Sequence, residues 1–276
     1  MIKKLLILLL LCSSVLGQVP YQKPMLGQQI DWSNPLAKGL VGYWPMLENG
    51  GLITQDASLN GNNGILNAGV LWAAGQYGPV LRMDGNTGIV ALGTAAAKPT
   101  LDVDYCTIVT SVKINKDLTG WCPLYGNGYT SGLWLAISSG EALSLYHTSE
   151  GNAFDSFISG AILTVGVRYQ VVATYDGANK NIYVNGFYAD GEATGAKSGP
   201  LDWSTGVINI GASGGYTTHY DIDYTMLYNR ALTAGEIEDL YNLQFGMFQP
   251  TFSVWWYSGI GGEPPATYGQ VIMISN

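Results

Sequence analysis

Short runs of apolar or alternating residues recur along the chain from Gly39 onward, and clusters of Gly, Asn, Asp or Ser separate most of them. These runs are Leu40–Met46, Val80–Met83, Ile89–Leu92, Tyr105–Ile114, Leu133–Ile137, Ala142–His147, Tyr169–Tyr175, Lys180–Val184, Val207–Ile210 and Ile222–Tyr228. Many short strands with regular turn signals are typical of an antiparallel sandwich or barrel. The strands do not alternate with helices, which disfavours a parallel α/β sheet.

Two local patterns predict specific elements. Tyr169–Tyr175 alternates with period two and leads into Asp176-Gly177, which favours a tight turn, and Asn185-Gly186 offers a second such turn. Near the carboxyl terminus, Thr233 and Glu236 have capping-box spacing, in which each residue caps the other's backbone N–H. Ile237, Leu240 and Tyr241 follow on one face, so we expect a single short helix from Thr233 to about Asn242.

The two ends of the chain differ from this pattern. Residues 1–17 have a basic start, an apolar run and small residues before Gln18, which is the layout of a secretory signal peptide. A lipoprotein cut before Cys12 is the alternative. Residues 18–38 contain three prolines and are expected to form an extended lead-in segment. Residues 247–276 hold two further strand-like runs, which either add a β-hairpin to the sheet or form an assembly module.

Composition narrows the function classes. Charged residues make up only 12% of the chain while 47% are hydrophobic, which excludes a disordered polyelectrolyte. The 37 glycines and 18 tyrosines agree with short strands and tight turns. The net charge of −8 makes a nucleic-acid partner held by phosphate contacts improbable. The leader predicts a protein that is secreted or on the cell surface. No stretch after the leader is long and apolar enough to span a membrane.

Two cysteines follow the leader, Cys106 and Cys122, and an oxidising compartment would allow them to pair. If residues 104–114 and 121–126 form a hairpin, the register places Cys122 nearer Val112 than Cys106. We therefore predict two buried thiols rather than a disulfide. CxxC spacing, which would indicate a cysteine zinc site, is absent.

Three ordered segments carry a family resemblance. The first is Gly39–Trp44 followed by Asp56–Gly64, the second is Val171–Gly177 with Ile182–Gly186, and the third runs from Ile222 through Leu227–Thr233 to Tyr241. Together they resemble the laminin-G-like, concanavalin A-like jelly roll found in many secreted bacterial and phage proteins. The resemblance covers residues 39–245, so we assign residues 39–246 to this domain. It implies an all-β, two-sheet antiparallel sandwich, and a virion surface if the gene belongs to a phage. Leu59 departs from the motif, which usually has Gly there.

The segment Asp56–Gly64 crowds carboxylate, hydroxyl and amide groups into nine residues. Calcium prefers six to eight such oxygen ligands. In family relatives this loop, together with the acid matching Asp223, often frames a calcium ion. The candidate metal ligands are therefore Asp56, Ser58, Asn60, Asn62 and Asp223. The alternative is an Asx-rich turn whose side chains cap their own backbone.

A sugar-binding face is the second candidate site. Aromatic side chains in the middle third could supply a platform for a carbohydrate, namely Trp121, Tyr125, Tyr129, Trp134 and Tyr146. The alternative is that these rings alternate into the core, where most large aromatics lie. Asn127 and Asn152 are further polar loop residues.

Catalysis has weaker support. A glycosidase needs two carboxylates flanking the scissile bond, and no segment shows the E-x-D-x-x-E pattern of glucanases with this fold. The sequence therefore predicts a non-catalytic, secreted recognition or adhesion module that binds a carbohydrate or glycoprotein surface and holds a structural calcium ion. The alternatives are a phage or cell-surface structural component that forms homo-oligomers through 247–276, and, third, a glycan hydrolase.

Overall fold

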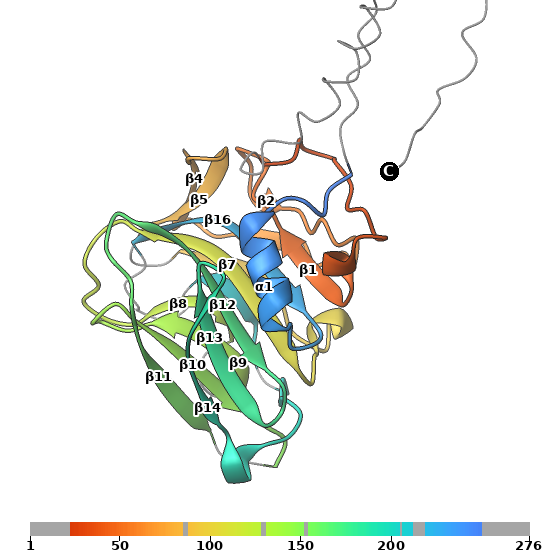
Figure 1. Ribbon diagram of the computed structural model, residues 1–276. Helices are drawn as coiled ribbons and strands as arrows, with labels where there is room; N and C mark the ends of the chain where they lie inside the picture. Colours follow the sequence, from red (N-terminus) through yellow and green to blue (C-terminus); the bar gives the residue numbers. More distant parts are fainter. Residues whose placement is uncertain are drawn as a thin grey trace, which may run out of the picture.

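The computed structural model describes residues 23–84, 88–127, 131–151, 154–204, 206–211 and 219–249, and these form sixteen strands, one α-helix and three short 3₁₀ helices. Figure 1 shows their arrangement. The predicted leader at 1–17, Tyr129, Asn152 and most of the predicted tail lie outside the described residues. The strands are β1 (Leu40–Trp44), β2 (Ile53–Thr54), β3 (Gly64–Leu66), β4 (Val70–Ala74), β5 (Pro79–Met83), β6 (Ile89–Gly93), β7 (Cys106–Ile114), β8 (Cys122–Gly126), β9 (Gly132–Ile137), β10 (Ala142–Thr148), β11 (Asp155–Ile162), β12 (Arg168–Tyr175), β13 (Asn179–Val184), β14 (Phe187–Ala193), β15 (Ile208–Gly211) and β16 (Tyr220–Tyr228). The helices are η1 (Pro35–Ala37), η2 (Pro99–Leu101), η3 (Gly195–Lys197) and α1 (Ala234–Asn242).

The strands form two antiparallel sheets. The first sheet has the order β14-β13-β12-β7-β16-β5-β4, with β1 also paired to β16. The second sheet has the order β11-β10-β9-β8-β15-β6-β3-β2. Sequence-distant strands are neighbours in both sheets, as in β7 beside β16 and β8 beside β15. This arrangement confirms the predicted two-sheet jelly-roll sandwich.

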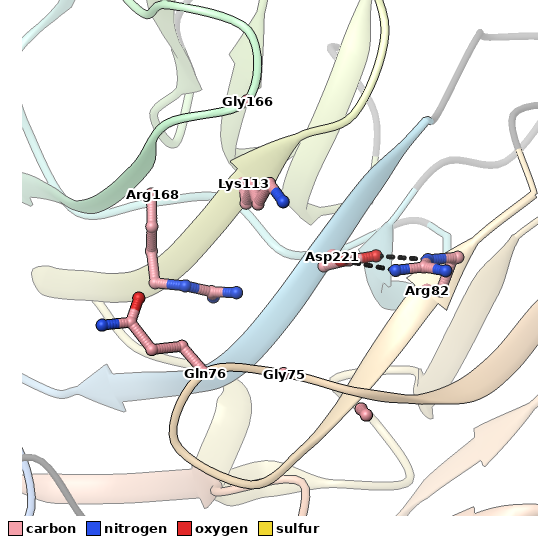
Figure 2. Close-up of a pocket in the computed structure, with 8 residues that line it drawn as sticks. Gly75, Gln76, Arg82, Lys113, Gly166, Arg168 and Asp221 are labelled. Carbon is pink, nitrogen blue, oxygen red and sulfur yellow. Dashed lines mark hydrogen bonds and ion pairs between the residues drawn. The ribbon is translucent and has the colours of Figure 1, made fainter.

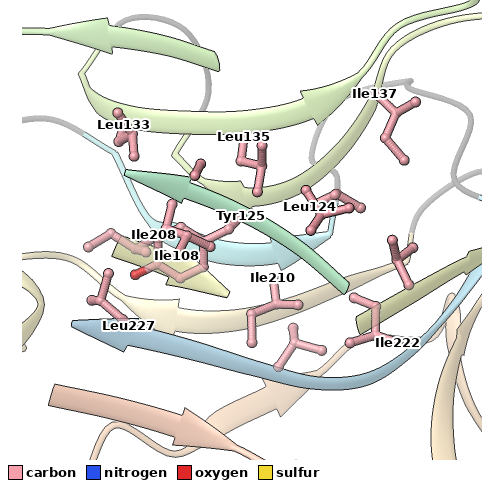
Figure 3. Close-up of a cluster of buried hydrophobic side chains, with 14 of the residues drawn as sticks. Ile108, Leu124, Tyr125, Leu133, Leu135, Ile137, Ile208, Ile210, Ile222 and Leu227 are labelled. Atoms are coloured by element: carbon pink, nitrogen blue, oxygen red, sulfur yellow. The ribbon is translucent and has the colours of Figure 1, made fainter. Parts of the chain in front are cut away.

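The core fills the space between the two sheets (Figure 3). Period-two alternation sends one set of side chains from each strand inward. In β7 this set includes Ile108 and Val112, and they meet Leu133 and Leu135 of β9 within the same buried cluster. Both cysteines belong to this cluster as free, buried thiols, as predicted. The reasoning that led there was wrong, because β7 and β8 lie in different sheets and form no hairpin.

A second apolar layer covers the outer face of the first sheet. Helix α1 lies over this sheet in Figure 1. Its Ile237 and Leu240 side chains pack in one buried cluster with Val172 of β12 and Tyr224 of β16. The helix begins as predicted, because Thr233 caps it and the capping box with Glu236 is complete. All nine residues of β16 are buried as a result of this double coverage.

The described parts of the predicted lead-in and tail complete this layer. Ile30 pairs with Phe248 in an isolated β-bridge, and both side chains are buried in the same cluster as α1. Leu36 and Met247 pack there too. The segments that precede and follow the sandwich strands in the sequence therefore pack together on the outer face of the first sheet. Among the described residues, no helix is long and apolar enough to cross a membrane.

The outer face of the second sheet has no such layer at its two flanks. In β11 exposed and buried positions alternate, and Ile158 is 56% exposed. In β6 and β3 only one face is fully buried, and Ile65 is 62% exposed. This outer face of the second sheet is called the open face below.

The ion pair at the start of α1 predicts an acid-dependent loss of stability. Arg230 donates to both carboxylate oxygens of Glu236, with distances of 2.9 and 2.7 Å, and this contact lowers the pKa of Glu236 from 4.5 to about 2. A pKa depressed in the folded state adds stability above pH 4.5, and that contribution disappears as the pH falls from 4.5 towards 2. We expect Glu236→Gln to melt below the wild type at pH 7, with the difference shrinking across this window. Glu238→Gln, on the exposed side of the same helix, is the control, and a constant difference for Glu236→Gln at every pH would contradict the assignment.

Candidate functional site

The open face carries a continuous row of residues that runs across six neighbouring strands. From β6 to β11 the row reads Ala91, Asn209, Gly126, Trp134, Tyr146 and Ser156. Gly126 lies beside Trp134 with φ +127°, and a Cβ there would collide with the Leu133 carbonyl oxygen. The strands can therefore approach only because this position lacks a side chain. In this row, Gly126 separates the polar Asn209 on one side from the aromatic Trp134 and Tyr146 on the other.

On the β6 side of that glycine lies a depression, called the asparagine pocket. Its volume is about 480 Å³, and it is lined by Asn67, Ile89, Ala91, Asn127, Gly206, Val207 and Asn209. None of these seven residues is charged. The volume falls within the roughly 300–1,000 Å³ of typical small-ligand sites. The pocket combines an apolar floor with amide groups at its edge.

Asn209 and Asn67 are held in fixed orientations. The Asn209 Nδ2 donates to the Val207 carbonyl at 2.9 Å, while its Oδ1 accepts no hydrogen bond from the described residues. The Asn67 Oδ1 accepts from the backbone N–H groups of Gly69 and Ile89, at 3.2 and 2.9 Å. Side chains whose rotamers are fixed by such contacts lose little entropy when they bind a ligand. Asn209 therefore presents a preorganised acceptor.

On the other side of Gly126 lies the aromatic cluster of Trp121, Trp134, Tyr146 and Phe154. Trp134 and Tyr146 are cross-strand partners with ring centroids 5.0 Å apart, and Trp121 packs 5.8 and 5.5 Å from them. Phe154 stacks on Tyr146 at 5.2 Å with an interplanar angle of 17°. Trp134 and Tyr146 are buried by this packing, whereas Phe154 is 38% exposed. Phe154 and the half-buried Trp121 are thus the rings that a ligand could contact.

The predicted aromatic residues divide into three outcomes. Trp121, Trp134 and Tyr146 lie together, in a cluster separate from the main core. Tyr125 lies in the core between the sheets and is fully buried, so it cannot contact a ligand (Figure 3). Tyr129 lies outside the described residues. Sequence reasoning missed Phe154, Asn67 and Asn209, and it named Asn127 without giving it a site.

The loop Asp56–Gly64 is organised by hydrogen bonds within the chain. The Asp56 Oδ1 accepts from the backbone N–H of Tyr43 and Ser58, at 3.0 and 2.9 Å, and its Oδ2 accepts from the N–H of Asn62 at 3.0 Å. The side chains of Ser58, Asn60 and Asn62 all donate to the Val41 carbonyl, at 3.1, 3.1 and 3.0 Å. These contacts fasten the loop to β1.

Asp223 lies in a different environment, on the outer face of the first sheet. It is fully buried, forms an ion pair with Arg168 and accepts from the Ser111 hydroxyl at 3.0 Å. The Lys23 ammonium donates to the backbone carbonyl oxygen of Asp223 and to those of Pro45 and Met46. Burial lowers the pKa of Lys23 well below its ordinary value. Two basic groups thus lie next to Asp223, and it shares no hydrogen-bond partner with Asp56 among the described residues.

This donor set does not fit a calcium ion. Both oxygens of Asp56 are engaged by N–H groups, and the amides of Asn60 and Asn62 turn their N–H groups towards Val41. No group of three or more His, Cys, Asp or Glu side chains suited to a metal occurs in the described part of the chain. The arrangement matches the Asx-rich turn named above as the alternative, and the calcium ion stays a prediction.

Replacement of Asp56 separates the two explanations. We expect Asp56→Ala to lower the free energy of unfolding by about 3 kcal/mol, because it leaves buried N–H groups without an acceptor. Asp56→Asn keeps an acceptor oxygen and should cost less. The measurement is chemical denaturation with and without EDTA. An EDTA-dependent loss of stability in the wild type that Asp56→Ala abolishes would support calcium, whereas a loss in Asp56→Ala that EDTA does not alter supports the hydrogen-bonded turn.

Several solved structures share this fold. The binding domain of Paraclostridial Mosquitocidal Protein 1 matches with a TM-score of 0.61 and 17% identity, over 75% of this chain and 52% of that one. The receptor-binding domain of botulinum neurotoxin C/D mosaic serotype matches with a TM-score of 0.58 and 17% identity, over 74% and 51%. Trypanosoma rangeli sialidase in complex with sialic acid matches with a TM-score of 0.57 and 19% identity, over 75% and 33%.

This chain spans about half the length of the two binding domains and a third of the sialidase. No curated protein matches the sequence. A family model, Laminin_G_3 of the concanavalin A-like lectin/glucanases superfamily, matches residues 84–238, which is more than half of the chain. Its range includes β7 to β16, and with them nearly all of the asparagine pocket and the whole aromatic cluster. The chain therefore belongs to the Laminin_G_3 family of the concanavalin A-like lectin/glucanases superfamily.

Proposed function

We propose that this protein is a secreted, non-catalytic recognition module that binds neutral carbohydrate at the asparagine pocket on its open face. The observation that carries the proposal is the uncharged pocket of about 480 Å³, with Asn209 presenting a fixed acceptor beside the apolar floor of Ile89 and Ala91. A sugar ring has hydroxyls that pair with amides and C–H faces that pack on apolar groups. The lining supplies both kinds of contact.

The aromatic cluster extends this site. Gly126 and Trp134 follow Asn209 in the row across the sheet, so the cluster begins beside the pocket. A glycan longer than one residue would leave the pocket and pass over Phe154 or Trp121. An aromatic contact of this kind contributes about 1 kcal/mol. A single shallow site of this type binds weakly, so several copies on one surface would be needed for firm attachment.

The comparisons support a binding role at this coarse level. Two of the similar structures are described as the binding domain of a mosquitocidal protein and the receptor-binding domain of a botulinum neurotoxin. Another is a sialidase in complex with sialic acid. At 17–19% identity these matches show that the fold is shared. The ligand proposed for this chain is therefore inferred from the residues of its own pocket.

The pocket's lining also favours binding over hydrolysis. Hydrolysis of a glycosidic bond normally needs two carboxyl groups at the bond, and the asparagine pocket holds none. Asp221 and Asp223 alternate along β16 of the first sheet, away from this pocket, and each of them pairs with an arginine of the same sheet. The alternative role in assembly depends on the predicted tail, of which residues 250–276 lie outside the described part, so it stays a prediction.

Filling the pocket tests the proposal. Val207 is 42% exposed at the pocket wall, so Val207→Trp should fill the pocket without disturbing the core and abolish binding on a glycan array. Asn209→Ala should weaken binding about fivefold through loss of one hydrogen bond, measured by calorimetry on a glycan that the array identifies.

Phenylalanine variants provide the matched control. Phe154→Ala should weaken binding about fivefold, whereas Phe187→Ala removes an equally large, 66% exposed ring from β14 of the first sheet and should have no effect. Each variant is checked by its melting temperature. Absence of binding to any neutral glycan, or equal binding by the wild type and Val207→Trp, would refute the proposal, and release of reducing ends would overturn its non-catalytic part.

A further inference from the structure

A second concave site lies on the outer face of the first sheet, opposite the open face. It is called the cationic pocket, has a volume of about 210 Å³, and is lined by Ala74, Gly75, Gln76, Arg82, Lys113, Gly166, Arg168 and Asp221. Arg168, Lys113, Asp221 and Arg82 are cross-strand partners in one row over β12, β7, β16 and β5. Directly opposed residues project from the same face of a sheet. Figure 2 shows these four side chains, with Gln76 on the β4–β5 loop close to Arg168.

The charges in this row do not balance. Three cationic side chains line the pocket against the single carboxylate of Asp221. That carboxylate is fully used, because Arg82 binds both of its oxygens at 2.7 and 2.9 Å and Asn115 donates to Oδ1 at 2.8 Å. Asp223, which does not line the pocket, pairs with Arg168. The three cationic side chains and the two carboxylates together carry a formal charge of +1. A positive pocket persists here on a chain whose net charge is −8.

Several donors in the pocket have no acceptor. Lys113 is half-buried and makes no hydrogen bond or ion pair with a described residue, and the Gln76 amide makes none either. Arg82 uses Nε and Nη2 for Asp221, so Nη1 remains for another partner. The Arg168 side chain is 13% exposed, and burial lowers the pKa of its guanidinium, so a nearby anion would favour its charged form. The donors left over come from four side chains on separate strands and a loop.

We propose that the cationic pocket binds a compact oxyanion, either the carboxylate of an acidic sugar or a free inorganic anion such as sulfate. Converging N–H donors of Arg and Lys form the strong, charge-assisted hydrogen bonds that carboxylate and sulfate oxygens accept. The volume lies below the roughly 300–1,000 Å³ of sites that enclose a whole drug-sized ligand. The pocket therefore takes one anionic group, and any remainder of the ligand lies outside it.

Lys113 is the group that distinguishes a binding site from a set of structural ion pairs. Arg82 and Arg168 both pair with acids of β16, and their replacement would disturb the fold. Lys113 has no such partner, so its replacement removes a ligand contact and leaves the ion pairs in place. Lys116 provides a control three residues away, because it is exposed, does not line the pocket and carries the same charge.

The experiment titrates the full chain with sodium sulfate, sodium glucuronate and glucose, using calorimetry in an anion-poor buffer. We expect the wild type to bind at least one of the two anions in the millimolar range. Lys113→Gln should lose about tenfold in affinity, while Lys113→Arg and Lys116→Gln keep it. Glucuronate binding more tightly than sulfate identifies the acidic sugar as the source, and the reverse order identifies the free ion.

Three results would overturn this proposal. The first is that the wild type binds neither anion, and the second is that Lys113→Gln binds as tightly as the wild type. The third is that Lys116→Gln loses as much affinity as Lys113→Gln, which would mean that the positive charge of the surface, rather than the pocket, attracts the anion. The outcome is independent of the carbohydrate site, because Val207→Trp fills the opposite face and should leave anion binding intact. Lys113→Gln should in turn leave binding of neutral glycans unchanged.

Discussion

Burial of the central strand β16 on both of its faces is the constraint on which the rest of the structure depends. Its inner face meets the core, and its outer face meets α1, the lead-in and residues 245–248, so β16 has no exposed residue. A polar group that lies beneath this layer must find a partner inside the protein. The Gln170 amide, for example, donates to the Tyr224 hydroxyl and the Leu240 carbonyl. The second sheet carries no comparable layer, and a site for a neutral ligand can therefore form on its surface.

A network of ion pairs around the buried Lys180 links the two sheets where β13 and β14 of the first sheet lie near β11 of the second. Lys180 of β13 is fully buried and binds Asp155 of β11 at 2.8 Å and Glu192 of β14 at 2.7 Å. Lys197 also pairs with Asp155, at 3.1 Å. Removal of one partner from a buried ion pair is costly, whereas the intact pair adds little net stability. The network thus joins β13 and β14 of the first sheet to β11 of the second while adding little net stability. It also holds the β10–β11 end beside Phe154, where the aromatic cluster lies.

The sequence was sufficient for those features that depend on local pattern. Alternation predicted the ten runs from Leu40–Met46 to Ile222–Tyr228, and the spacing of Thr233 and Glu236 predicted the helix start. It could not predict β14, because Phe187 and Tyr188 are exposed on an edge strand and share it with Asp, Gly and Glu. The proposed β7–β8 hairpin was wrong because the chain crosses from the first sheet to the second between these two strands.

The site was harder to predict for the same non-local reason. Period two shows that Trp134 and Leu135 project from opposite faces, but not which of them meets the core. A shift of register between Pro123 and Tyr125 then turns Tyr125 inward, although Trp121, directly before this strand, packs in the outer aromatic cluster. The asparagine pocket joins residues from 67 to 209, and the cationic row joins residues from 82 to 221. Both exist only once distant strands pair.

The separation of the two proposed sites limits how they can work together. They lie on the outer faces of two stacked sheets, and packed sheets are about 10 Å apart before the outer side chains are counted. A monosaccharide cannot span that thickness, so one small ligand never occupies both sites. A long glycan would have to pass around the edge of the sandwich to contact both. Otherwise the two sites engage different molecules, one neutral and one anionic, and the protein would then bridge them as a cross-linking module. Simultaneous engagement raises avidity only where the geometry permits it.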